Sequence, residues 1–142
     1  MKKPFDLAGS LGKIAVTSVL VGGVAIVAYK AFRGSSPREP ATLSTLAAAG
    51  KVLFEANCGP CHGAQGNGTD HGPPFINDIY NPGHHPDVAF LLAARNGVRA
   101  HHWRFGNMPP VEGITEAEIA AIVKYVRELQ EANGITFRPH VM

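Results

Sequence analysis

The sequence predicts an all-α protein: a domain of three to four short helices, preceded by a single N-terminal transmembrane helix. Three observations support this prediction. Apolar residues recur at helical spacing in three capped segments after residue 43, these residues contain no confident strand pattern, and an uncharged run of 16 residues stands near the N-terminus. The length of 142 residues allows one ordinary domain with a tail.

The uncharged run extends from Ile14 to Tyr29, between Lys13 and Lys30. As a helix it covers about 24 Å, whereas a bilayer core is about 30 Å thick. The flanking lysine stems can fill the difference, so we expect a signal anchor over residues 11–32 that contacts membrane lipid. Two alternatives stay open: a cleaved secretory signal, for which no clean cleavage site follows, and a buried helix, against which the lack of a polar face argues.

Composition divides the chain after this run. Residues 34–40 contain two serines, two prolines and no large apolar side chain, which is typical of a linker. We therefore predict five parts: a cytoplasmic N-terminus (1–10), the anchor (11–32), a flexible linker (33–43), a folded domain (44–137) and a C-terminal tail (138–142).

Charge follows the same division. Residues 1–40 hold six basic and two acidic residues, a net charge of +4, whereas residues 41–142 hold seven and nine, a net charge of −2. The basic pI of about 8.7 therefore belongs to the N-terminal part. Nucleic acid is excluded as a partner, because a binder needs clustered lysines and arginines to neutralise phosphates.

The first helix of the predicted domain begins near Ser44 or Thr45, either of which can cap it, and ends at Asn57-Cys58. Helical spacing places four residues on one face: Leu46, Gly50, Leu53 and Phe54. Residues 59–86 are rich in glycine and proline and show no periodic pattern. A loop of this length needs a functional reason, and something apolar must fill the space that it encloses.

Two more helices are predicted. One starts at Pro86, with Asp87 in its first turn, and ends at Asn96-Gly97; its apolar face carries Val88, Leu91 and Leu92. The other opens with a capping box at Thr115 and Glu118 and ends at Asn133-Gly134. Its apolar residues recur at helical spacing: Ile119, Ile122, Val123, Val126 and Leu129.

Both cysteines lie in one short motif, Cys58-Gly59-Pro60-Cys61-His62. A structural zinc site needs four ligands, so His62 and a second histidine would have to complete it. A thioredoxin-like redox pair needs a strand before and a helix after it, and here a helix precedes and a glycine-rich loop follows. Covalent haem attachment uses all three residues, because two thioethers hold the vinyl groups while the adjacent imidazole reaches the iron.

Two further features favour one covalent haem c per chain. A buried haem supplies the apolar filling that the long loop lacks, and the N-terminal export segment fits an attachment made in bacteria on the outer side of the inner membrane. The charges on the two flanks of the anchor do not settle its orientation. Haem attachment on the outer side settles the orientation. We expect residues 1–10 in the cytoplasm and the domain in the periplasm.

With these motifs, residues 44–132 resemble a class I cytochrome c. The resemblance rests on the Cys58–Gly63 motif, on Gly72-Pro73-Pro74, on Asn107-Met108-Pro109-Pro110 and on an aromatic in the last helix, Tyr125. It implies that His62 is the proximal iron ligand and that the carbonyl of Pro73 accepts a hydrogen bond from its other ring nitrogen. It also implies a close crossing of the first and last helices through Gly50, Phe54 and Tyr125.

The resemblance makes Met108 the second axial ligand. This methionine lies in a turn-rich segment before the last helix, and the other methionines, Met1 and Met142, are at the ends of the chain. Three alternatives stay open: a core-filling methionine, a vacant sixth position, or a histidine ligand. The candidate histidines are His71, His84, His85, His101 and His102.

Two adjacent histidine pairs, His84-His85 and His101-His102, allow three interpretations. They can be exposed loop residues, or they can together hold a second metal such as copper. Alternatively, His101, Trp103 or Arg104 bonds the haem propionates, because buried carboxylates need donors. The family uses an indole or an arginine for that purpose.

The expected function is electron transfer, not catalysis. Cys58, Cys61, His62, Pro73, Trp103, Arg104 and Met108 form the expected cofactor-binding set. Two axial ligands leave no open iron position, and an anchored carrier would shuttle single electrons between membrane redox complexes or soluble redox proteins. The alternatives are a haem sensor or small catalyst with an open sixth position, and a fixed subunit of a larger dehydrogenase or oxidase.

Overall fold

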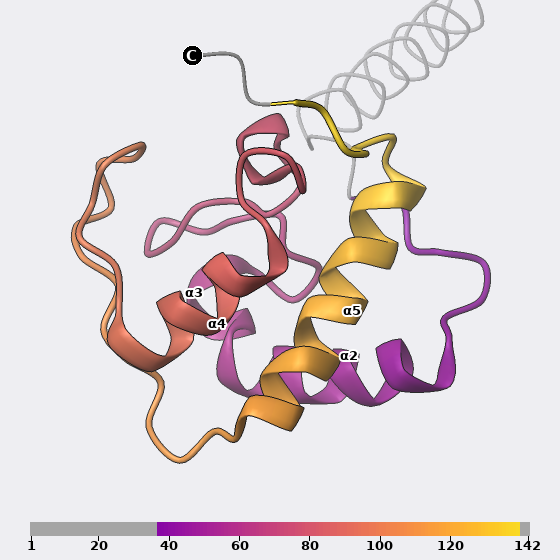
Figure 1. Cartoon of the computed structure of the whole chain (residues 1–142), viewed down its shortest axis with the longest axis horizontal. Helices are drawn as coiled ribbons and strands as arrows, with labels where there is room; N and C mark the ends of the chain where they lie inside the picture. The colour runs from indigo at the N-terminus through magenta and orange to yellow at the C-terminus, as the bar shows by residue number, and fades with distance from the viewer. Residues whose placement is uncertain (1–36, 140–142) are drawn as a thin grey trace, which may run out of the picture. The chain divides into compact units, whose positions relative to one another are not determined.

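The computed structural model describes residues 37–139 (Figure 1). The predicted cytoplasmic N-terminus and anchor (1–10 and 11–32) lie outside these residues, as do the start of the linker and the end of the tail. Between residues 37 and 139, no helix combines the length and apolar character that crossing a membrane requires.

The described residues form four α-helices and one short 3₁₀ helix: α2 (Thr45–Asn57), α3 (Gly59–His62), η1 (Asp78–Tyr80), α4 (Asp87–Asn96) and α5 (Glu116–Ala132). These residues contain no strand beyond an isolated antiparallel bridge between Val98 and Met108. The predicted all-helical domain of three to four short helices is therefore confirmed.

Helices α2 and α5 cross and form the main core (Figure 1). At the crossing Gly50 meets the backbone of Ala121, so closely that a Cβ on Gly50 would overlap the Ala121 carbonyl. Next to it the rings of Phe54 and Tyr125 pack with centroids 5.4 Å apart. The cluster is completed by four buried side chains: Ala47, Ile122, Val126 and Leu129.

The predicted caps are present at both helices. The Ser44 hydroxyl accepts a hydrogen bond from the Ala47 amide at 3.2 Å and so starts α2. Thr115 and Glu118 form a reciprocal capping box at the start of α5. Each cap satisfies amides that have no partner within the helix, which explains why both boundaries were readable in the sequence.

Between α2 and α5 the structure differs from the expectation in three places. The long loop of residues 59–86 contains α3 and η1, single turns too short to produce a periodic pattern. Helix α4 begins one residue later than predicted, at Asp87, with Pro86 as its N-cap. Val88 and Leu92 of α4 remain half-exposed, at 53% and 50%; Leu92 borders a cavity, and α4 contributes no buried residue to the core.

Residues at both edges of the predicted domain contact it. Asn133 donates a side-chain hydrogen bond to the carbonyl of Arg38 at 2.8 Å, and Glu39 pairs with Lys51 at 2.8 Å. At the other edge Arg138 pairs with Asp78 at 2.8 Å. The described part of the predicted linker therefore lies against the domain from Arg38 onward, as does the start of the predicted tail.

Candidate functional site

The two cysteines stand at the junction of α2 and α3. The amide of Cys58 donates to Phe54 at 2.8 Å and closes α2, while its carbonyl accepts from the His62 amide at 2.9 Å inside α3. Pro60 lies in the first turn of α3, where its missing N–H costs nothing. This tight turn brings Cys58, Cys61 and His62 to the wall of one cavity.

The cysteines are free of any disulfide. Burial, with a smaller contribution from Cys61, raises the pKa of the Cys58 thiol to about 11. Reactive redox thiols have lowered pKa values instead. The environment of Cys58 thus disfavours the redox-pair interpretation.

His62 is held from two sides. Its Nδ1 lies 2.9 Å from the carbonyl oxygen of Pro73, and its ring stacks on Phe75 with centroids 4.3 Å apart. Burial lowers its pKa, against a smaller opposing effect of the Pro73 hydrogen bond. The imidazole is therefore neutral, and because a carbonyl only accepts, Nδ1 carries the proton and Nε2 keeps a lone pair for a metal.

The cavity beside His62 measures about 690 Å³, which is the size range of cofactor sites in proteins. Its lining is mostly apolar, and the loop between α4 and α5 contributes the largest share, with further residues from α4, the α2–α3 junction and the inner face of α5. Val98 and Met108 line it from the loop between α4 and α5. The side chains of the domain leave this space unfilled, and a large apolar group can occupy it.

Met108 reaches the cavity from a constrained loop. Its amide and carbonyl exchange hydrogen bonds with Val98 at 3.0 and 2.9 Å. Gly97, with a φ of +72°, packs against the Met108 carbonyl so closely that a side chain there would clash. This bridge returns the loop to α4 and sets Met108 on the cavity wall with its side chain half-buried.

Trp103 and Arg104 lie in the same loop but differ in placement. The indole Nε1 of Trp103 is buried and lines the cavity. It makes no hydrogen bond of good geometry among the described residues, although it lies close enough to the Tyr80 hydroxyl to oppose the rise that burial causes in the pKa of Tyr80. A donor with so weak a partner is left able to bond an acceptor on a group in the cavity. Arg104 is exposed and is not part of the lining.

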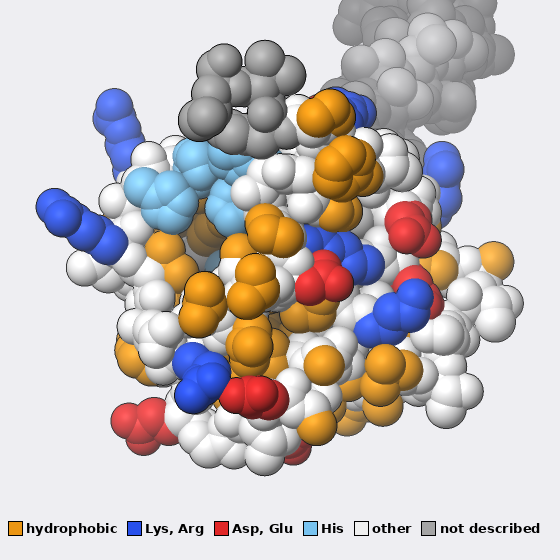
Figure 2. Space-filling view, in the orientation of Figure 1, with side chains coloured by type: hydrophobic (Ala, Val, Ile, Leu, Met, Phe, Trp, Pro, Cys, Tyr) orange, Lys and Arg blue, Asp and Glu red, His pale blue; other side chains and the backbone are white. Residues whose placement is uncertain are grey.

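The two histidine pairs come together in space. Figure 2 shows the histidine side chains as one pale-blue patch on the surface. Ligand atoms of His84, His85 and His102 lie within 4.8 Å of one another, and the ring of His101 lies 4.3 Å from that of His102. Burial, followed by the neighbouring imidazoles, lowers the pKa of His102; the pKa of His85 is lowered by burial first, and also by these neighbours. His71 is exposed and stands apart from the cavity lining.

Sequence reasoning missed Arg127, which organises the segment before α4. Its guanidinium donates to Asp87 at 2.7 Å and to the carbonyls of Tyr80 and His85 at 2.8 and 2.5 Å. Gln130, also missed, accepts from it at 2.7 Å. Their positions in the sequence could have identified them, because Arg127 and Gln130 fall at helical spacing after Val123 and so face inward with it.

Comparisons with known proteins agree with this site. A family model described as cytochrome c matches residues 47–130. The chain is 35% identical over 98 residues to the cbb3-type cytochrome c oxidase subunit FixP of Azorhizobium caulinodans. That match covers 67% of this chain and 33% of the relative, so the chain spans about a third of the relative's length. No solved structure gives a significant match.

Proposed function

This chain belongs to the cytochrome c family, as a class I member with covalent haem c, and on that premise we propose that it transfers electrons through an iron ligated by His62 and Met108. The observation that carries the proposal is that His62, both cysteines and Met108 line one apolar cavity of about 690 Å³. When bound, the haem supplies one-electron chemistry by cycling between ferric and ferrous iron. Cys58 and Cys61 would hold it through thioethers.

His62 and Met108 would then set the properties of the iron. The Pro73 carbonyl and the Phe75 ring hold the His62 imidazole in one tautomer and one orientation, and the hydrogen bond makes Nε2 a stronger donor. The Met108 thioether is a soft ligand that favours ferrous iron and raises the reduction potential. With both ligands in place, the iron keeps no position for a substrate, and this supports a carrier over an enzyme.

Trp103 would secure the polar edge of the haem. Trp103 stands on the loop that the Val98–Met108 bridge closes, its indole N–H is buried, and a propionate is the acceptor that a haem offers. Arg104, exposed on the same loop, is proposed as a second donor at the outer side of the propionates.

The proposed setting is the outer face of a bacterial inner membrane. Residues 11–32 would anchor the chain in lipid as a single-pass helix, with the cytochrome domain in the periplasm. Membrane redox complexes or soluble redox proteins would then give and accept electrons within reach of the tether.

A second candidate role is a fixed subunit of a larger oxidase. The printed name of the FixP relative, a subunit of a cbb3-type cytochrome c oxidase, favours it. Purification of the full chain in mild detergent separates the two roles. A free carrier elutes alone, whereas a subunit elutes with haem-containing partner chains in fixed proportion.

The test of axial ligation is an optical spectrum of the oxidised and reduced protein, made in a host that attaches haem. Met108→Ala should abolish the long-wavelength sulfur-to-iron band and lower the potential. The matched control is Met142→Ala, which should leave both unchanged. A Met108→Ala protein with the wild-type spectrum would refute the assignment, and rapid carbon monoxide binding to the reduced wild type would favour the sensor alternative.

A further inference from the structure

We propose that His84, His85 and His102 form a second metal site, for a late first-row divalent ion such as Zn²⁺ or Cu²⁺, on the surface beside the haem cavity. The three side chains each offer one nitrogen, and these nitrogens lie within 4.8 Å of one another. The site is separate from the proposed axial ligands, His62 and Met108, and it requires that none of its three histidines ligates the iron.

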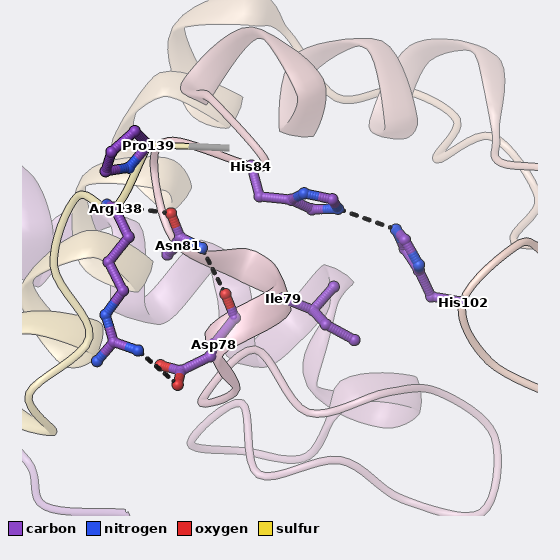
Figure 3. Close-up of a pocket in the computed structure, with 7 residues that line it drawn as sticks. All are labelled: Asp78, Ile79, Asn81, His84, His102, Arg138 and Pro139. Atoms are coloured by element: carbon purple, nitrogen blue, oxygen red, sulfur yellow. Dashed lines mark hydrogen bonds and ion pairs between the residues drawn. The ribbon is translucent and has the colours of Figure 1, made fainter. Parts of the chain in front are cut away.

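The distance between His84 and His102 has the value that a shared metal requires. Their Nε2 atoms lie 3.2 Å apart and face one another across a surface depression (Figure 3). Two imidazole nitrogens at about 2.0–2.1 Å from one tetrahedral ion stand about 3.3 Å apart. An ion between them would replace the present contact with little movement of either ring.

His85 is preoriented as a third ligand. Its Nδ1 lies 2.7 Å from the carbonyl oxygen of Ile79, so Nδ1 carries the proton and Nε2 keeps the lone pair. Metal-bound histidines usually show this arrangement, in which a backbone carbonyl holds the far nitrogen. The His85 backbone is held as well, through its amide to Asn81 at 2.9 Å and its carbonyl to Arg127.

The two halves of the site come from segments with restrained backbones. The amide of His84 donates to Asn81 at 3.0 Å, in the turn that follows η1. His102 stands on the loop that the Val98–Met108 bridge closes, where Asn107 also accepts from the Ala100 amide at 3.0 Å. Restraint of this kind lowers the cost of ordering ligands around an ion.

The donor set indicates the class of metal. Three imidazoles suit zinc, copper and other late first-row ions, whereas calcium and magnesium prefer oxygen ligands. Three protein ligands leave a fourth position for water or a further ligand, as in open zinc sites. His102 is exposed, so an ion can reach the site from solvent.

The competing interpretation is that these histidines serve the haem. His85 and His102 also line the haem cavity, and an imidazole donating to a propionate would not be available to a second ion. The two interpretations differ in the haem-loaded protein, because only a separate metal site still binds an added ion there.

The experiment uses the full-length haem-loaded chain in mild detergent, oxidised and carrying no polyhistidine tag. Zn(II) and Cu(II) are titrated separately by calorimetry, and the metal-to-haem ratio is measured after gel filtration. One ion per haem is expected for each metal, and Cu(II) should bind more tightly. His102→Ala should weaken binding by about 100-fold or more, because the loss of an outer-shell partner alone typically costs 10–100-fold.

His71→Ala is the matched control, an exposed loop histidine outside the cluster, and should bind as the wild type does. His102→Ala should keep the spectral signature of both proposed axial ligands, which separates this proposal from the assignment of those ligands. The proposal is overturned if neither metal binds at one ion per haem, or if His102→Ala binds as tightly as His71→Ala.

Discussion

Gly50 of α2 lies against the backbone of Ala121 in α5, with no space for a Cβ between them. This contact lets the two helices approach closely enough for the rings of Phe54 and Tyr125 to pack beside it. Because α2 leads into the cysteine motif and α5 forms one wall of the haem cavity, the crossing positions the site.

Gly50→Ala should therefore destabilise the domain. The added methyl group collides with the Ala121 carbonyl, a backbone atom that moves only if the helices separate. We expect a loss of about 2 kcal/mol or more in the free energy of unfolding. Guanidinium denaturation of the haem-loaded protein measures it. Ala49→Ser, at an exposed neighbouring position, is the control and should change stability by about 0.5 kcal/mol or less; equal effects of the two changes would refute the role of the crossing.

Arg127→Ala should also be strongly destabilising. Arg127 is buried, and its removal leaves the His85 carbonyl without its donor and the Tyr80 carbonyl with Gln130 as its remaining donor. We expect a loss of about 2–4 kcal/mol. The control is Arg95→Ala, which breaks an exposed pair with Glu116 and should cost at most about 1 kcal/mol. Thermal and chemical denaturation compare them, and a similar cost for both would show that the Arg127 network is not structural.

The raised pKa of the Tyr125 hydroxyl predicts that folding stability falls at alkaline pH. Burial, with smaller contributions from Glu39 and Glu55, raises its pKa to about 12, above the usual value near 10. Between these two values the unfolded chain loses this proton and the folded chain keeps it. Stability from this group is therefore complete below pH 10 and is lost as the pH rises towards 12.

Tyr125→Phe should remove this contribution to the loss of folding stability at alkaline pH. The hydroxyl has no hydrogen-bond partner among the described residues, so its removal at pH 7 should leave stability unchanged or raise it by about 1 kcal/mol. Unfolding curves of both proteins from pH 7 to 11.5 measure the difference, which should grow above pH 10. A loss of more than about 1 kcal/mol at pH 7 would show that the hydroxyl has a partner.

Trp103→Phe tests the proposed propionate donor. The change removes the buried indole N–H but keeps an aromatic ring at the cavity wall. A propionate without this donor carries a less compensated negative charge, which favours ferric iron. We expect the reduction potential to fall by about 20–40 mV, the equivalent of about 0.5–1 kcal/mol for one electron.

Potentiometric titration measures this shift, and the spectrum should keep the signature of both axial ligands. Phe137→Leu, a change at an exposed aromatic outside the cavity lining, is the control and should leave the potential near its wild-type value. Equal potentials for Trp103→Phe and the wild type would place the indole away from the propionates.

Local sequence patterns were sufficient to predict much of the fold. The caps at Ser44 and Thr115 involve residues three or fewer positions away, so each boundary could be read from a few consecutive residues. The apolar spacing of α5 identified its buried face for the same reason. The turns α3 and η1 were missed because three or four residues are too few to show a period.

The candidate site also contains one part that the sequence predicts and another that only packing brings together. Cys58, Cys61 and His62 are neighbours in one turn, so the sequence by itself determined the attachment motif and with it the family of the protein. The four-residue spacing leaves the chain little freedom to separate these groups. Tertiary structure was not needed to propose what they do.

Only the tertiary structure decided which distant residues meet. The approach of His102 to His84 and His85 depends on the Val98–Met108 bridge, and the Arg127 contacts join α5 to a segment about 40 residues earlier in the chain. Such contacts have no local signature, because they arise when loops close and helices pack. The sequence determined the chemistry of each residue, and packing determined which of these chemistries share a site.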